Sequence, residues 1–259
     1  MISLTTAEIN AWIVAFFFPL ARILALLSAA PPFNNTGVSV RVRLLLGLAI
    51  TMAIAPTLPK ITLIEPASGL GLLILAQQMV IGFAMGLALR LVFSAVDIAG
   101  TLISNEMGLG FATAYDRNSA SQTPVVSEFL GILALLLFMA INGHLMVIAT
   151  LVQSFSVIPI GIGSVASGSW LNIASAGGVI FSSGLFLALP IVVTLMITNM
   201  ALGILGRVAP QLNLMAIGFP VTIALGFIAL LVSMSYLGTP LLQLFEFGLQ
   251  SMLKFFVLS

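Results

Sequence analysis

The residues best suited to chemistry in this sequence are ionisable side chains that stand inside long apolar runs. Arg90, Ser94, Asp97 and Thr101 are spaced 4, 3 and 4 residues apart, so one narrow face of a helix would carry all four. Such a stripe can line a path for an ion or solute, join Arg90 to Asp97 along the helix, or bind polar groups of another protein. Lone charges are costly in lipid, so the sequence favours a pore or a protein contact over lipid exposure.

Arg22, Glu128 and His144 are further ionisable residues in apolar surroundings. We expect Arg22 and Glu128, like the stripe, to face the interior of a helix bundle or a partner. His144 is the one histidine and is a candidate proton carrier. It has no acidic neighbour nearby in the sequence, which favours a neutral imidazole hydrogen-bonded at a helix contact.

The remaining composition argues against catalysis. The chain has no cysteine, which excludes disulfides, cysteine metal sites and thiol chemistry, and it contains no phosphate-binding Gly-x-x-x-x-Gly-Lys-Ser/Thr loop. It also lacks a close pair of carboxylates. We therefore predict that it is not an enzyme and has no catalytic, cofactor-binding or metal-binding residues. The net charge of +1 gives no electrostatic indication of nucleic-acid binding.

These side chains must be positioned by membrane helices. Charged residues make up 6% of the chain, against about a quarter in soluble domains, and hydrophobic residues make up 61%. A water-soluble fold of 259 residues cannot hide that much apolar surface. The predicted class is an all-α integral membrane protein with several spans.

The first half of the chain predicts helices of unusual lengths. A capping box at 5–8 predicts a helix that starts near Thr6 and runs to Ala30. The run 44–58 is short for a span of about 20 residues, and the run 69–102 is too long for one straight span. Within the long run, Gly82 and Gly86 form a small-xxx-small pair that lets another helix approach closely.

The second half predicts three more apolar segments. Thr123 as N-cap and Pro124 at the first helical position predict a helix that continues through Asn142, Gly143 and His144. A loop is expected at 154–170, followed by apolar runs at 174–206 and 216–237. Thr239-Pro240 predicts a fresh helix start, and the C-terminal helix is expected to be amphipathic, with a polar stripe of Gln243, Glu246, Gln250 and Lys254.

The segment 104–123, near mid-chain, is the least apolar part of the sequence. It is rich in Gly, Ser, Thr and Asn and cannot continue as a lipid-facing helix. A surface connection is the simpler explanation. However, the segment is about twenty residues long and has an apolar centre at 107–112, which favours a functional loop.

Five motifs in this order and spacing resemble the FliR family of flagellar type III export-gate proteins and its SctT/SpaR-like virulence-secretion counterparts. They are Ala21-Arg22-Ile23-Leu24, Val40-Arg41-Val42-Arg43, Glu106-Met107-Gly108-Leu109-Gly110-Phe111-Ala112, Asn142-Gly143-His144-Leu145, and Arg207-Val208-Ala209-Pro210-Gln211-Leu212-Asn213 leading to Gly218-Phe219-Pro220. Each motif alone is weak, but the set is specific and runs from the first helix to the last.

The resemblance implies a subunit of a helical export gate in the bacterial inner membrane, at the flagellar basal body. The implied partners are FliP, FliQ and FlhB subunits, the lipid membrane and unfolded flagellar substrate proteins. The implied organisation is a FliP-like part at 1–170, with a plug loop at about 105–123, and a FliQ-like helical hairpin at 171–259. Energy would come from proton-motive force and a separate ATPase.

The resemblance also implies roles for individual residues. The plug would comprise Glu106, Met107, Gly108, Leu109, Gly110 and Phe111, with Met107, Leu109 and Phe111 as the apolar seal and the two glycines supplying backbone freedom. Buried polar or inter-subunit positions would be Arg22, Arg90, Asp97, Glu128, His144, Arg207 and Gln211. The alternatives are a stand-alone transporter or channel that uses Arg90, Asp97 and Glu128, and an assembly scaffold with no conducting role.

Overall fold

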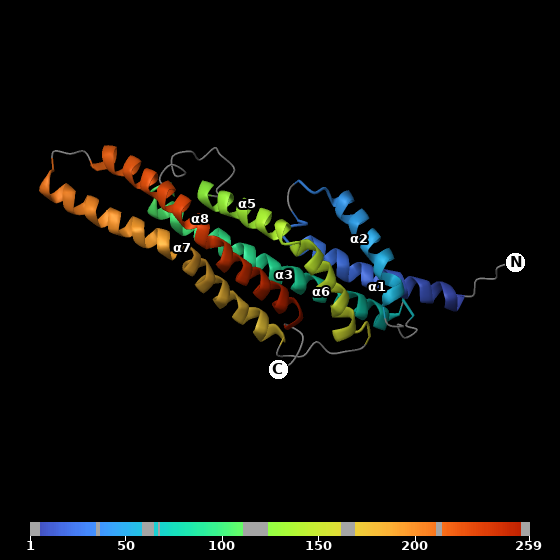
Figure 1. The fold of residues 1–259 in the computed structure, drawn as a ribbon. Helices are drawn as coiled ribbons and strands as arrows, with labels where there is room; N and C mark the ends of the chain where they lie inside the picture. The colour runs from blue at the N-terminus through green and yellow to red at the C-terminus, as the bar shows by residue number, and fades with distance from the viewer. Residues whose placement is uncertain are drawn as a thin grey trace. The chain divides into compact units, whose positions relative to one another are not determined.

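The computed structural model of the chain describes residues 6–34, 37–58, 65–66, 68–110, 124–161, 169–210 and 214–254. All regular structure within these ranges is helical (Figure 1). The elements are α1 (Thr6–Ala29), α2 (Val40–Ile54), the 3-10 turn η1 (Ala55–Thr57), α3 (Gly69–Glu106), α5 (Val125–Ala140), α6 (Gly143–Val157), α7 (Ser169–Val208) and α8 (Leu214–Lys254).

Five of these segments are long and apolar enough to cross a membrane, and α5 with α6 make a sixth if they form one broken span. The predicted class of all-α membrane protein is confirmed. Helix α1 is described from Thr6 onward, and the predicted cap at Thr5 lies outside the described residues. The overlong run is a single helix, α3, of 38 residues. At about 1.5 Å per residue it is roughly 57 Å long, well beyond a hydrocarbon core of about 30 Å.

Three predicted helix boundaries and the extent of one predicted loop are wrong. The helix from Val125 stops at Ala140, and Asn142 adopts a left-handed conformation with φ of 58° before α6 begins at Gly143. Asparagine tolerates this conformation better than most residues, which explains a break inside an apolar run. Pro124 is the N-cap residue, with an extended backbone, and Val125 is the first helical residue. Thr123 lies outside the described residues.

The third error concerns the C-terminus. Helix α8 runs without interruption from Leu214 to Lys254 and contains both Pro220 and Pro240, so no new helix starts at Thr239. A proline removes one backbone hydrogen bond and crowds the preceding turn, which a helix held by packing on either side can accommodate. The predicted loop at 154–170 is also shorter, because α6 continues to Val157 and α7 begins at Ser169.

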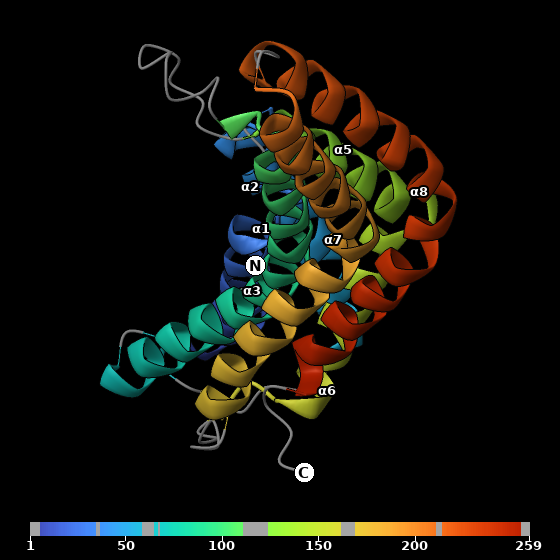
Figure 2. The same cartoon turned by 90° about the vertical axis from the view of Figure 1, so that its left-hand side faces the viewer.

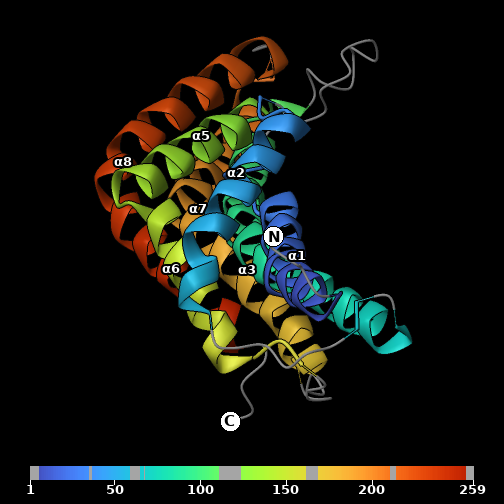
Figure 3. The same cartoon turned by 90° about the vertical axis from the view of Figure 1, so that its right-hand side faces the viewer.

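The chain forms two compact units, each with its own packing. The first unit contains the described residues of 1–91, 142–176 and 245–259, and the second those of 92–141 and 177–244. In the second unit the 177–208 part of α7 and the 214–244 part of α8 run antiparallel beside each other (Figure 2). The N-terminal part of α3 lies beside α1 in the first unit (Figure 3).

Helices α1 and α3 of the first unit approach closely at Gly82 and Gly86, as predicted. A Cβ at Gly82 would overlap the backbone carbonyl of Arg22 and come within 3.0 Å of Ala25 Cβ. A Cβ at Gly86 would come within 2.6 Å of Ala29 Cβ and 2.7 Å of the Leu26 carbonyl oxygen. Only glycine fits at these positions, so the pair sets the distance between the two helices.

In the second unit, glycines again allow close contacts between α3 and its neighbouring helices. Gly100 lies against the backbone of Ser127 in α5, and Gly184 of α7 lies against the Ala95 carbonyl oxygen, which would be 2.7 Å from an added Cβ. Phe93 and Phe138 pack edge to face, with ring centroids 5.9 Å apart. Helix α3 is therefore closely packed by both α5 and α7.

Candidate functional site at the end of α3

Helix α3 ends in a well-formed glycine stop immediately before the central segment. The amide of Gly108 donates to the Asn105 carbonyl at 3.0 Å, and the amide of Leu109 donates to the Ser104 carbonyl at 3.0 Å. Gly108 has a φ of 77°. This pair of hydrogen bonds around a left-handed residue is the Schellman arrangement, which satisfies the last carbonyls of a helix. The stop fixes the direction in which the chain leaves α3.

Met107 is held inside the second unit, and its side chain is fully buried. Gly226 of α8 lies directly against it, because a Cβ at position 226 would come within 2.6 to 2.8 Å of the Met107 Cγ, Sδ and Cε atoms. The Thr222 hydroxyl donates a hydrogen bond shared between the carbonyl oxygens of Met107, at 3.3 Å, and Phe219, at 3.0 Å. The flexible thioether of Met107 thus occupies the space that a side chain at position 226 would need.

Phe219 completes the same contact surface. Two carbons of its ring, Cδ1 and Cε1, would each lie 2.9 Å from a Cβ at Gly108. Phe219, Thr222 and Gly226 are spaced 3 and 4 residues apart, so one face of α8 presents all three to the end of α3. We call these three residues the α8 cradle.

Helix α7 contacts the same end of α3. The Asn199 side-chain amide lies 3.3 Å from both the Glu106 carbonyl oxygen and Glu106 Oε2, and it donates to them. Leu109 is half-buried and Gly110 is exposed. Phe111, which the resemblance assigns to the predicted seal, lies outside the described residues.

Arg22 forms a separate polar cluster in the first unit, where it is fully buried. Its Nε donates to Gln78 Oε1 at 2.7 Å, its Nη1 to Ser154 Oγ at 3.0 Å, and its Nη2 to the Ile158 carbonyl at 2.9 Å. The guanidinium also lies 4.2 Å from the centre of the Phe155 ring. All three hydrogen-bond acceptors are neutral, so the guanidinium joins α1, α3 and the end of α6 through hydrogen bonds.

The other predicted polar positions differ from Arg22 in burial. Arg90, Asp97, Glu128 and Arg207 are exposed on the chain by itself, and Gln211 lies outside the described residues. Asp97 accepts a hydrogen bond from the Ser127 hydroxyl, which lies 3.1 Å from its carbonyl oxygen and 3.4 Å from Oδ1. Their burial against partners remains a prediction.

His144 stands in the first turn of α6 and is partly buried. Its Nδ1 atom is buried and has no hydrogen-bond partner among the described residues. Among the described residues, no three His, Asp or Glu side chains lie close enough together to hold a metal ion. At the end of α3, contacts from α7 and α8 hold the beginning of the central segment in place.

Sequence reasoning missed the residues that hold the predicted ones. Gln78 and Ser154, which bind Arg22, and Asn199 and Thr222, which bind the end of α3, carry no signal beyond being polar residues in apolar runs. Gly226 carries a weak signal, because an isolated glycine in a helix often marks the close approach of another part of the chain. Pairing Met107 with Gly226 requires the tertiary fold.

Comparison with known proteins identifies close relatives. Residues 13–248 match the family described as bacterial export proteins, family 1. The chain is 45% identical over 231 residues to the flagellar biosynthetic protein FliR of Pectobacterium carotovorum, which covers 89% of this chain and 88% of that protein. The FliR of Escherichia coli K12 is 42% identical over 87% of this chain and 86% of its own length. The Bacillus subtilis FliR is 28% identical over 92% and 93%.

Proposed function

The chain belongs to family 1 of the bacterial export proteins, and we propose that it is a membrane subunit of a flagellar type III protein export gate. In this role it lies in the bacterial inner membrane at the flagellar basal body. It assembles with FliP-, FliQ- and FlhB-type subunits into a channel for unfolded flagellar proteins. The names of the relatives and the membrane-length helices support this proposal.

The observation that carries the proposal is the glycine stop at the end of α3. The segment that begins at Glu106 leaves the helix at a defined angle, with Met107 held by the α8 cradle and Glu106 hydrogen-bonded to Asn199. A segment anchored at its root can project from a fixed point and still move beyond it. We assign the closing plug to this segment, with Met107, Gly108, Leu109, Gly110 and Phe111 as its apolar part.

We further propose the division suggested by resemblance, with a FliP-like part at 1–170 and a FliQ-like hairpin at 171–259. The antiparallel course of α7 and α8 supports the hairpin. The exposed charges Arg90, Asp97 and Arg207 lie on membrane-length helices, and Glu128 lies on α5, one half of the bent α5–α6 pair; lipid is a poor environment for all four. Contact with sister subunits would remove them from lipid.

The test of the plug is a deletion in the assembled gate. Removing Gly108–Phe111 is expected to raise the conductance of small ions across membranes that contain the complete gate, because the apolar part of the plug is lost. Deleting the four residues 163–166, between α6 and α7 and outside the proposed plug, serves as the matched control and should leave conductance near the wild-type level. Unchanged conductance in the first deletion would overturn the plug assignment.

The test of the subunit role is co-purification. The tagged chain is expected to bring down FliP- and FliQ-type subunits from membranes, and the chain made without them is expected to accumulate poorly. A chain that purifies alone in functional form and takes up a small solute would contradict the gate role and support the stand-alone transporter.

A further inference from the structure

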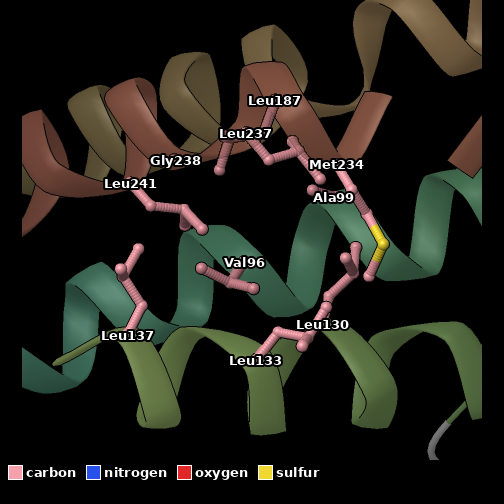
Figure 4. A pocket seen from close by; sticks show the side chains of 10 residues that line it. All are labelled: Val96, Ala99, Leu130, Leu133, Leu137, Leu187, Met234, Leu237, Gly238 and Leu241. Atoms are coloured by element: carbon pink, nitrogen blue, oxygen red, sulfur yellow. The ribbon is translucent and has the colours of Figure 1, made fainter. Parts of the chain in front are cut away.

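The second unit contains an apolar pocket with a volume of about 220 Å³. Ten residues of α3, α5, α7 and α8 line it, and Figure 4 shows their side chains pointing into a common space. Its floor is buried, with Val96 at 2% and Ala99 at 1% exposure, whereas Met234 at the edge is 37% exposed. The pocket is therefore hollowed into the unit and reaches its surface.

The lining determines what the pocket can bind. All ten lining residues are Leu, Val, Ala, Met or Gly, so none brings a charged, hydroxyl or amide side chain. A water molecule needs two to four polar partners to remain in a buried site, and this pocket offers none from its side chains. Apolar cavities of this size are known to stay dry and to accept hydrocarbon molecules. The lining therefore suits a hydrocarbon group.

The shape favours a chain over a ring. Leu130 and Leu137 on α5 stand at opposite ends of the pocket, and Met234 and Leu241 on α8 mark the same two ends (Figure 4). Seven residues of helix extend about 10 Å, so the pocket is long for its volume.

The surroundings supply such a chain. Helices α3, α7 and α8 each have membrane length and composition. Next to the lining residues, the outer faces of the helices expose large apolar side chains, including Leu136 at 60%, Phe186 at 73% and Leu231 at 72%. Lipid tails can cover such a surface and enter a pocket that opens on it. We propose that the pocket binds the end of one acyl chain of a membrane phospholipid, independently of the export role.

Gly238 provides the variant that tests this. It lines the pocket, and a Cβ at this position would have no atom within 4 Å. Gly238→Leu therefore places a side chain in open space and is expected to fill the pocket. Gly203 of α7 also has open space around it and does not line the pocket. Gly203→Leu is the matched control.

The experiment labels the full chain in bacterial membranes whose phospholipids carry a fatty acid with a diazirine near its methyl end. After irradiation, the wild-type chain is expected to carry label on the peptides with Met234 and Leu241. Gly238→Leu should reduce this label at least fivefold, and Gly203→Leu should preserve it. Gly238→Ala should give an intermediate value, which keeps the test decisive if the leucine variant does not fold.

Two results would overturn the proposal. One is labelling of Met234 and Leu241 that Gly238→Ala and Gly238→Leu leave unchanged, since the lipid would then lie outside the pocket. The other is an absence of lipid label at these residues together with a cross-link from a photoreactive residue at position 234 to a partner protein. That result would assign the pocket to a side chain of the partner.

Discussion

Gly226 lies against the side chain of Met107, and no side chain larger than hydrogen fits between them unless Met107 moves. Met107 is the first residue after α3, and Gly226 stands in the first third of α8. A residue of the proposed plug and a residue of the proposed hairpin are therefore complementary in shape.

Gly226→Val is expected to push Met107 out of the α8 cradle. Overpacking of this kind costs about 1–3 kcal/mol, so the thermal midpoint of the purified gate should fall and its ion leak should rise. Gly203→Val, at a position with open space, is the control and should change neither quantity. A wild-type leak in Gly226→Val would show that the Met107 contact does not hold the gate closed.

Gly108→Ala is expected to destabilise the end of α3 for two reasons. The left-handed backbone at this position costs a residue with a Cβ about 1–2 kcal/mol, and the new methyl group would meet the Phe219 ring. The double variant Gly108→Ala with Phe219→Leu should recover part of the loss by relieving the ring contact. Thermal denaturation of the wild type, the two single variants and the double variant measures both contributions. Full recovery of stability in the double variant would contradict the backbone argument.

Gly82→Ala is expected to separate α1 from α3. The added methyl group would overlap the Arg22 carbonyl, which belongs to a helix backbone and has little freedom to move. The expected loss is about 1–3 kcal/mol, seen as lower accumulation and a lower thermal midpoint. Gly69→Ala on the same helix has no atom within 4 Å and is the control. Equal stability of the two variants would contradict the close approach.

Arg22→Ala is expected to destabilise the first unit because Gln78 Oε1 loses its buried donor. A buried polar group without a partner costs about 1–3 kcal/mol. Arg22→Lys should recover only part of this, because a single ammonium cannot replace the planar fork that joins Gln78, Ser154 and Ile158. Protease resistance of the full chain in membranes ranks the stability of the wild type, Arg22→Lys and Arg22→Ala. Full recovery of resistance in Arg22→Lys would refute the role of the planar guanidinium.

Glu128→Gln and Arg207→Gln are expected to leave the stability of the isolated chain unchanged, because both side chains are exposed on it. If these charges meet sister subunits, each variant should reduce the amount of FliP- and FliQ-type protein that co-purifies with the chain. Arg41→Gln, another exposed charge, provides a comparison from α2. Unchanged recovery of partners in both variants would argue against inter-subunit roles at these two positions.

Periodicity and composition were enough to predict much of this protein. The membrane class, the overlong helix and the close approach at Gly82 and Gly86 all follow from local rules of length, composition and side-chain size. The polar stripe of the last helix is also present, with Gln243, Glu246, Gln250 and Lys254 all exposed. These features depend on residues close together in the chain, so the sequence contains their causes.

Only the tertiary structure decided which polar groups have partners and where helices stop. Asn142 breaks one apolar run, while Pro240 fails to break another, because packing from other helices outweighs local preference. Arg22 finds its acceptors 56 to 136 residues away, and Met107 finds Gly226 across 119 positions. Such pairs satisfy buried polar groups or fill missing volume, and these requirements arise only when distant helices are brought together.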